Sequence, residues 1–196
     1  MKRCLFAAFS LVSINMASAA VITYSAILSG AAEAPPNASP GTGLATVAID
    51  DLANTMSLNV TFDNLLGQTT VAHIHCCTAV PLTGTAGVAT ATPSFPGFPA
   101  GVTSGSYNRV FDLTAVATYN PAFVTSNGGV AGAQAALLSG LAAGTAYYNL
   151  HTRAFPGGEI RGFLTPAQVS EPASLALFGL AGLGLLALQR RRRLPV

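Results

Sequence analysis

The strongest constraint on the fold is a strict alternation of apolar and polar residues over residues 56–63, MSLNVTFD. The apolar positions are Met56, Leu58, Val60 and Phe62. Because successive side chains of a strand point to opposite faces, this alternation predicts a half-buried antiparallel strand. We therefore expect Leu58 and Val60 to lie in a hydrophobic core. Asn59 and Thr61 are expected to face outward.

Most of the chain between the two termini has the same β character. Further strands are predicted over residues 23–30, 44–50, 71–75, 109–113, 146–152 and 159–164. From Val130 to Leu141 the apolar residues instead follow the helical spacing i, i+3, i+4. This spacing predicts one short helix, ended by Gly140 or Gly144.

Two stretches rich in turn-forming residues separate these strands. Residues 32–43 contain several prolines and glycines, which fit an exposed loop and not a central strand. Residues 78–106 are rich in Thr, Gly and Pro and are predicted to form a long irregular loop that Phe95 and Phe98 pin down. Many short strands, one helix and Pro/Gly-rich turns indicate an antiparallel sandwich or a flattened barrel.

The N-terminus has the three parts of a secretory signal peptide. A short basic head is followed by an apolar run that ends at Met16, and residues 17–19 place small side chains at the cleavage site. The run is shorter than the roughly 20 residues that a membrane-spanning helix needs. We therefore predict cleavage near Ala19 or Ala20, and Cys4 leaves with the signal.

The C-terminus has a second tripartite pattern. The triplet Ser170-Glu171-Pro172 is followed by an apolar run from Ala173 to Leu188 and then by four consecutive arginines. The run is long enough for a short transmembrane helix, and the arginines keep its end on the cytoplasmic side. This tail resembles the PEP-CTERM sorting signal of Gram-negative bacteria, although Ser170 stands where that family's motif has proline. The resemblance implies transient anchoring in the inner membrane, removal by an exosortase-type enzyme, and delivery to the cell surface or an exopolysaccharide matrix.

The chain thus divides into a signal peptide (residues 1–20), one domain (21–165) and a sorting segment (166–196). The domain has a normal size for one hydrophobic core. Its charges are three arginines and six acidic residues, a net charge of −3, and it contains no lysine. Without a basic patch, nucleic-acid binding is excluded. A surface made polar mainly by hydroxyl and amide groups favours association with a polysaccharide or a protein partner.

The stretch VAHIHCCTA holds two of the chain's three histidines, His73 and His75, and the third is His151. If Ile74 and Leu150 face the core, all three histidines lie on outward faces, because residues two apart in a strand share a face. Should the two strands be neighbours, three imidazoles would suit Cu or Zn. Alternatively, the histidines cap polar edges by hydrogen bonding to Thr, Asn or the long loop.

Cys76 and Cys77 have no other cysteine to pair with after the signal is removed. Free thiols do not persist in an oxidising compartment without protection. Three outcomes are open: a vicinal disulfide, thiolate ligation of a metal beside His75, or pairing with another molecule. We predict the vicinal disulfide, which would restrain the unfolded chain little and would act locally.

The sequence contains no recognisable catalytic constellation. It has no G-x-S-x-G nucleophile motif and no phosphate-binding glycine loop. Acid–base catalysis by carboxylates needs two acids at a defined separation, and the sequence places no second acid beside Glu33. Glu159 and Arg161 are expected to form an ordinary ion pair on one strand face. We therefore expect no enzymatic activity.

Two segments carry a further resemblance. AHIHCCTA, followed far downstream by AYYNLHTRAFPGGEIRGFL, resembles the CHRD domain over roughly residues 21–164. The most specific parts are residues 73–75, 149–152 and 156–162. The resemblance implies an immunoglobulin-like or superoxide-dismutase-like β-fold and no established enzymatic activity.

Together these observations predict an all-β protein, an antiparallel β-sandwich with one short helix, flanked by two terminal apolar helices. The first functional hypothesis is an exported, non-catalytic β-domain that is a binding or structural component of the cell envelope or exopolysaccharide matrix. The alternative is a metal-binding (Cu or Zn) or redox protein that uses the His-x-His strand. Whether the three histidines converge would discriminate between them.

Overall fold

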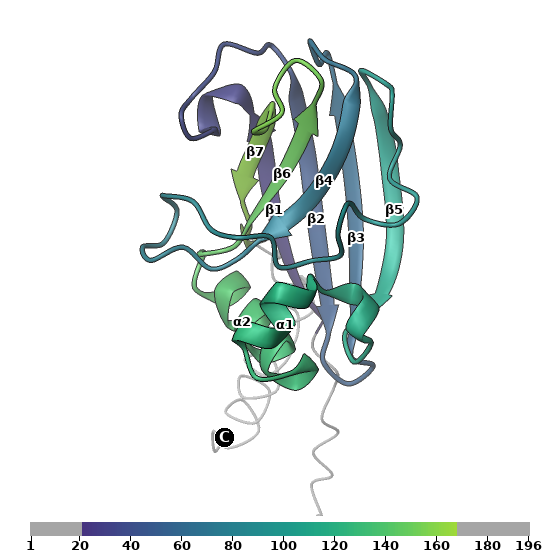
Figure 1. Cartoon of the computed structure of the whole chain (residues 1–196), viewed down its shortest axis with the longest axis vertical. Helices are drawn as coiled ribbons and strands as arrows, with labels where there is room; N and C mark the ends of the chain where they lie inside the picture. The colour runs from purple at the N-terminus through teal and green to yellow at the C-terminus, as the bar shows by residue number, and fades with distance from the viewer. Residues whose placement is uncertain (1–20, 168–196) are drawn as a thin grey trace, which may run out of the picture. The chain divides into compact units, whose positions relative to one another are not determined.

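The computed structural model describes residues 21–167, which form a curled antiparallel sheet with few helices (Figure 1). The strands are β1 (Val21–Ser29), β2 (Thr42–Asp50), β3 (Thr55–Asp63), β4 (Thr69–His75), β5 (Gly105–Asp112), β6 (Tyr147–Thr152), β7 (Ile160–Phe163) and β8 (Thr165–Pro166). Along the sheet they follow the order β4-β6-β7-β1-β2-β3-β5, and β8 pairs with β1. The prediction of a mostly β, antiparallel chain is confirmed.

The sheet curls at the junction between β7 and β1. These strands are joined by one residue pair, Ser29 and Arg161, whereas β1 and β2 pair along their whole length. The strands β4, β6 and β7 therefore form one end of the sheet, and β1, β2, β3 and β5 form the other. The buried apolar residues of both ends belong to one core cluster.

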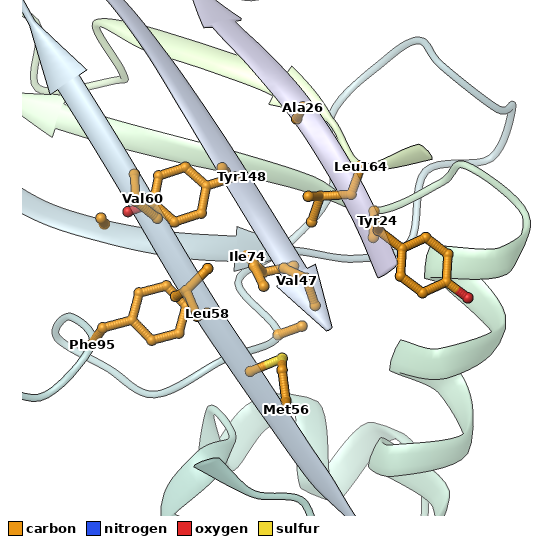
Figure 2. Packing of buried hydrophobic residues seen from close by; sticks show 14 of the residues in the cluster. Tyr24, Ala26, Val47, Met56, Leu58, Val60, Ile74, Phe95, Tyr148 and Leu164 are labelled. Carbon is orange, nitrogen blue, oxygen red and sulfur yellow. The ribbon is translucent and has the colours of Figure 1, made fainter. Parts of the chain in front are cut away.

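Strand β3 has the alternation that the sequence predicts. Leu58 is 1% exposed and Val60 is fully buried, whereas Asn59 and Thr61 are exposed. Figure 2 shows Leu58 and Val60 close to Ile74 of β4 and Tyr148 of β6. The core thus lies between the two ends of the sheet, and burial of these side chains supplies the main driving force for the curl.

The two α-helices lie together beyond one end of the strands, at the bottom of the view in Figure 1. Helix α2 (Val130–Ala142) agrees with the predicted helix. Helix α1 (Pro121–Ser126), which the sequence analysis missed, is capped by the Asn120 side chain, an acceptor for the Ala122 amide. Six residues are too few to show a helical period, so only the Asn-Pro start marks α1 in the sequence. Two short 3-10 turns, η1 (Gly30–Ala32) and η2 (Val116–Thr118), complete the helical elements of residues 21–167.

The long loop between β4 and β5 packs along the outer edge of β4. The Phe95 amide donates to Ala72 O (3.3 Å), and the Ala89 amide donates to Ile74 O (2.9 Å). Phe95 and Phe98 are 2% and 8% exposed, so the prediction that they pin this loop is confirmed.

Strand β5 begins four residues earlier than predicted. Its core-facing side chains Tyr107 and Phe111 flank the exposed Arg109, which interrupts the apolar pattern. Arg109 is accommodated because β5 is an edge strand and its Nη1 donates to Pro96 O (2.9 Å).

Among residues 21–167, no helix has the length and apolar character that a membrane span requires. The two predicted apolar terminal helices lie outside the described residues, as does the Ser170-Glu171-Pro172 triplet.

Candidate metal centre

The three histidines come from two neighbouring strands. In the pairing of β4 with β6, Val71 lies opposite His151, His73 opposite Asn149, and His75 opposite Tyr147. Ile74 and Leu150, which alternate with these residues, are fully buried in the core. The prediction that the histidines share the opposite face is therefore confirmed.

The histidines also converge in space. One ligand nitrogen from each ring lies within 4.8 Å of the others. The ring centroid of His73 lies 5.9 Å from that of His75 and 5.7 Å from that of His151. The centroids of His75 and His151 are 6.1 Å apart. Within residues 21–167 this is the one group of three or more potential metal-ligating side chains.

The face that carries the histidines is largely covered, contrary to the expectation of outward-facing side chains, and His151 at its margin is half-buried. His73 is 5% exposed and His75 is 9% exposed. The long loop covers both rings with its backbone: His73 Nε2 lies 2.6 Å from Pro93 O, and His75 Nδ1 lies 2.9 Å from Ala86 O. An outward strand face therefore becomes a second interior layer.

These contacts determine which ring nitrogens carry protons. A carbonyl oxygen can only accept a hydrogen bond, so His73 Nε2 and His75 Nδ1 are the donors. His151 Nδ1 donates in the same way to Pro156 O (2.9 Å). The remaining nitrogens, His73 Nδ1, His75 Nε2 and His151 Nε2, are buried and have no hydrogen-bond partner. Each ring thus keeps one buried lone pair.

The environment also keeps the imidazoles neutral. Burial lowers the pKa of His75 to about 4, and the charges of His73, His151 and Arg161 act in the same direction. Burial likewise lowers the pKa of His73 and that of His151. Neutral imidazole is the form that binds a metal ion, so the site does not have to lose protons at neutral pH.

The donor set fits a transition metal. Metal-ligating histidines almost always donate their other N–H to a carbonyl or carboxylate, and all three rings have this arrangement. One ligand nitrogen of each ring lies within 4.8 Å of the others, so the three side chains could hold one ion between them. Imidazole ligands suit both Cu and Zn.

A neighbouring tyrosine supports His75. Tyr147 is 2% exposed and stacks on the His75 ring, with centroids 4.8 Å apart and planes at 9°. Its hydroxyl is 3.2 Å from both Ala86 O and Ala86 N, so Tyr147 and His75 are anchored to the same backbone group. The guanidinium of Arg161 lies 4.8 Å from the centre of the Tyr147 ring.

The polar row continues from His73 to Asn149 and Arg161 across β6 and β7. The expected ion pair of Arg161 with Glu159 does not form. Instead, Nε of Arg161 lies 3.8 Å from Oε2 of Glu33. Burial raises the pKa of Glu33 to about 7, against the opposing charge of Arg161. Glu33 Oε1 and Asn149 Oδ1 are further buried acceptors without a partner. This face therefore has a surplus of lone pairs over donors.

Glu159 points away from Arg161 because adjacent strand and loop groups solvate it. It is fully buried and accepts hydrogen bonds from the Ser39 and Thr152 hydroxyls (2.6 Å each) and from the amides of Leu66 (2.6 Å) and Gly67 (3.1 Å). Burial opposes its ionisation, but these four donors outweigh it and lower the pKa of Glu159. Glu159 thus ties three chain segments together and has no place in the metal centre.

The cysteines follow the last residue of β4 and contact helix α2. The structure joins Cys76 and Cys77 in a disulfide, and their sulfurs lie 3.8 and 3.5 Å from Ala136 O of α2. The ring of His75 instead faces Ala86. Thiolate ligation beside His75, one of the open alternatives, is therefore not the arrangement in this structure.

Sequence reasoning missed the groups that orient the histidines. Tyr147 could have been found from its position opposite His75 once β4 and β6 were paired. The carbonyls of Ala86, Pro93 and Pro156 leave no signal, because every residue type has one.

Two family models match the chain. The model described as CHRD domain matches residues 24–164, and the model described as PEP-CTERM protein-sorting motif matches residues 168–193. Neither a curated protein nor a solved structure matches the chain.

Proposed function

This chain belongs to the CHRD domain family and carries a PEP-CTERM sorting motif, and we propose that its domain binds one copper or zinc ion through His73, His75 and His151. The sorting motif marks an exported protein that an exosortase processes from a transient membrane-anchored precursor. Metal binding would then take place outside the cytoplasm, at the cell surface or in the extracellular matrix.

The observation that carries this proposal is the surplus of buried lone pairs. Three ring nitrogens without a hydrogen-bond partner lie on one covered face, each in a ring whose other nitrogen is anchored to a carbonyl. An unpartnered buried acceptor costs about 1–3 kcal/mol. A bound cation would satisfy all three at once. The alternative of histidines that only cap the loop explains one nitrogen of each ring and leaves the other without a partner.

The domain is proposed to act by binding and not by catalysis. The loop buries His73 and His75 almost completely, so a bulky substrate has no access to a metal held there. When bound, the metal would contribute a stable, positively charged centre. The chain's own residues would hold it and orient the ligands, with Tyr147 fixing the position of His75.

Metal titration of the exported, processed protein tests the proposal. After treatment with a chelator and dialysis, the protein is expected to bind one Cu(II) or Zn(II) per chain by calorimetry and elemental analysis. Loss of a group that only orients a ligand typically lowers the metal affinity 10–100-fold. His75 is proposed as a direct ligand, so His75→Ala should lower the metal affinity by at least about 100-fold. Asn59→Ala, on the exposed face of β3, is the control and should leave it unchanged. A stoichiometry far below one ion per chain, or equal affinities of the two variants, would refute the metal centre.

A matrix-binding role is the second candidate, and the exposed face of the β1-β2-β3-β5 end favours it. Ser25, Thr46, Asn59 and Asn108 lie side by side across these four strands. Their hydroxyl and amide groups would suit hydrogen bonding to a neutral polysaccharide. Co-sedimentation with the exopolysaccharide of the producing cell tests this role, and loss of binding in Asn59→Leu is the expected outcome. Equal co-sedimentation of Asn59→Leu and the unmodified protein would exclude this face.

The enclosed core also supports, in finer detail, the immunoglobulin-like or superoxide-dismutase-like sandwich that the resemblance implies. The two ends of the curled sheet would correspond to the two layers of such a sandwich.

A further inference from the structure

The disulfide lies where β4 ends and meets helix α2. Cys76 is 5% exposed, whereas Cys77 is exposed. Both sulfurs contact α2 at a position without a side chain, because a Cβ at Gly140 would overlap the two Sγ atoms. The helix is therefore shaped to accept the cysteine pair.

An open pocket leads to this pair. It has a volume of about 620 Å³, and its lining includes both cysteines, Val88, Phe123 and Ala136. The remaining lining residues are small or carry amide or hydroxyl groups, and none is charged. A thiolate that enters the pocket therefore meets no fixed negative charge.

The pair has little value as a global staple. A cross-link stabilises mainly by shortening the loop that the unfolded chain can form, and two adjacent residues enclose almost none. Its exposed sulfur and its pocket indicate a chemical role instead. We propose that Cys76–Cys77 is a reversible thiol–disulfide exchange site, which a small thiol reaches through this pocket.

Reduction of the protein disulfide consumes two molecules of the small thiol. The thiolate of the first attacks Sγ of the exposed Cys77, the Cys76–Cys77 bond breaks, and its electron pair leaves on Cys76 Sγ, which takes a proton from water. The thiolate of a second molecule then attacks the sulfur of the bound first molecule. It releases the Cys77 thiolate, which is protonated, and forms the disulfide of the small thiol. The protein pair is reduced and two thiols are oxidised.

The surroundings accommodate the reduced form. Ala136 O lies within 3.8 Å of both sulfurs and would accept a hydrogen bond from a thiol S–H. A disulfide sulfur carries no hydrogen, so this contact becomes a hydrogen bond only in the reduced state.

The site is linked to the histidine face through the backbone. The Cys76 amide donates to Gly87 O (3.1 Å), and the adjacent Ala86 O accepts from His75. Reduction is therefore expected to change the metal affinity. This consequence rests on the proposed function, whereas the exchange itself does not involve the metal.

Native-state alkylation tests the exchange site. The exported protein, treated with a chelator, is incubated with millimolar glutathione, alkylated with iodoacetamide and weighed by mass spectrometry. Addition of two alkyl groups without loss of the folded circular dichroism spectrum is expected, and replacement of glutathione by excess glutathione disulfide before alkylation should restore the unmodified protein disulfide, with release of two glutathione thiols. Alkylation only after denaturation would overturn the proposal. Because no metal is present, failure here is distinct from failure of the metal titration.

Two tryptophan variants test the route. Ala122 is exposed and lines the pocket, so Ala122→Trp should slow reduction by glutathione at least about tenfold, since exchange rates depend on access. Ala135 is exposed on α2 outside the pocket lining, and Ala135→Trp should react at the unmodified rate. Equal rates for the two variants would show that the thiol does not enter through this pocket. Melting curves of both variants check that the fold is intact.

Discussion

At the scale of single residues, burial determines the protonation of His75. The covering loop lowers its pKa to about 4, below the ordinary value of 6.5. Between these two pKa values the unfolded chain has bound this proton and the folded chain has not. The free energy of unfolding therefore rises with pH in this range. The contribution is fully present above about pH 6.5 and is lost as the pH falls toward 4.

We therefore expect His75 to contribute a rise in the free energy of unfolding of the metal-free protein between pH 4.5 and 7.5, whereas Glu33, whose pKa burial raises to about 7, contributes in the opposite direction. His75→Gln should reduce this rise, by up to about 3 kcal/mol, because one pKa unit corresponds to about 1.4 kcal/mol. Urea unfolding at the two pH values measures the difference. Asn108→Ala, an exposed residue of β5, is the control. The same pH slope in both variants would show that His75 is not the responsible group.

Glu159 is a second residue whose environment sets its role. Glu159→Gln keeps the size but replaces one acceptor oxygen by an NH₂ group that faces hydrogen-bond donors. We expect a loss of about 2–4 kcal/mol in the free energy of unfolding at pH 7. Asp63→Asn, at an exposed position of β3, should stay within about 0.5 kcal/mol. Urea denaturation of both variants tests this, and similar small losses would mean that the four donors contribute little.

At the scale of elements, the burial of a strand can be predicted from its sequence when one face packs on the core and the other faces solvent. Strand β3 has a core on one face and solvent on the other, so its pattern is readable from the sequence. Strand β4 is covered on both faces, and His73 and His75 lie on its second, polar interior. Its burial therefore depends on the loop that folds over it.

Strand β3 offers a matched pair of substitutions. Leu58→Ala leaves a cavity in the core and should cost about 2–5 kcal/mol. Thr61→Ala on the exposed face should cost between 0 and about 1 kcal/mol. Thermal or urea unfolding compares the two. Equal losses would contradict the orientation of β3.

At the scale of the whole molecule, the sorting motif predicts the form that leaves the cell. The signal peptide and the tail after the Ser170-Glu171-Pro172 triplet should both be removed. We expect the extracellular protein to run from about Ala20 to near Ser170, measured by intact mass spectrometry. A chain recovered outside the cell with its four C-terminal arginines would contradict exosortase processing.

The sequence by itself indicated export and determined the β class, the alternation of faces in β3 and the identity of the histidines. These follow from local patterns: a small-x-small cleavage site, a period of two, and rare residue types at fixed spacing. The resemblance to the CHRD domain, which the family match bears out, rests on the same local motifs.

Only the tertiary structure decided that the histidines meet, that a loop buries them, and that Arg161 pairs with Glu33. His151 reaches His73 and His75 because β6 pairs with β4, a contact between strands more than seventy residues apart that is set by the shared core and not by either segment. The anchoring carbonyls and the partner of Arg161 come from loops without a repeating pattern. A local sequence records which face a side chain takes, but only the packed chain determines what lies against that face.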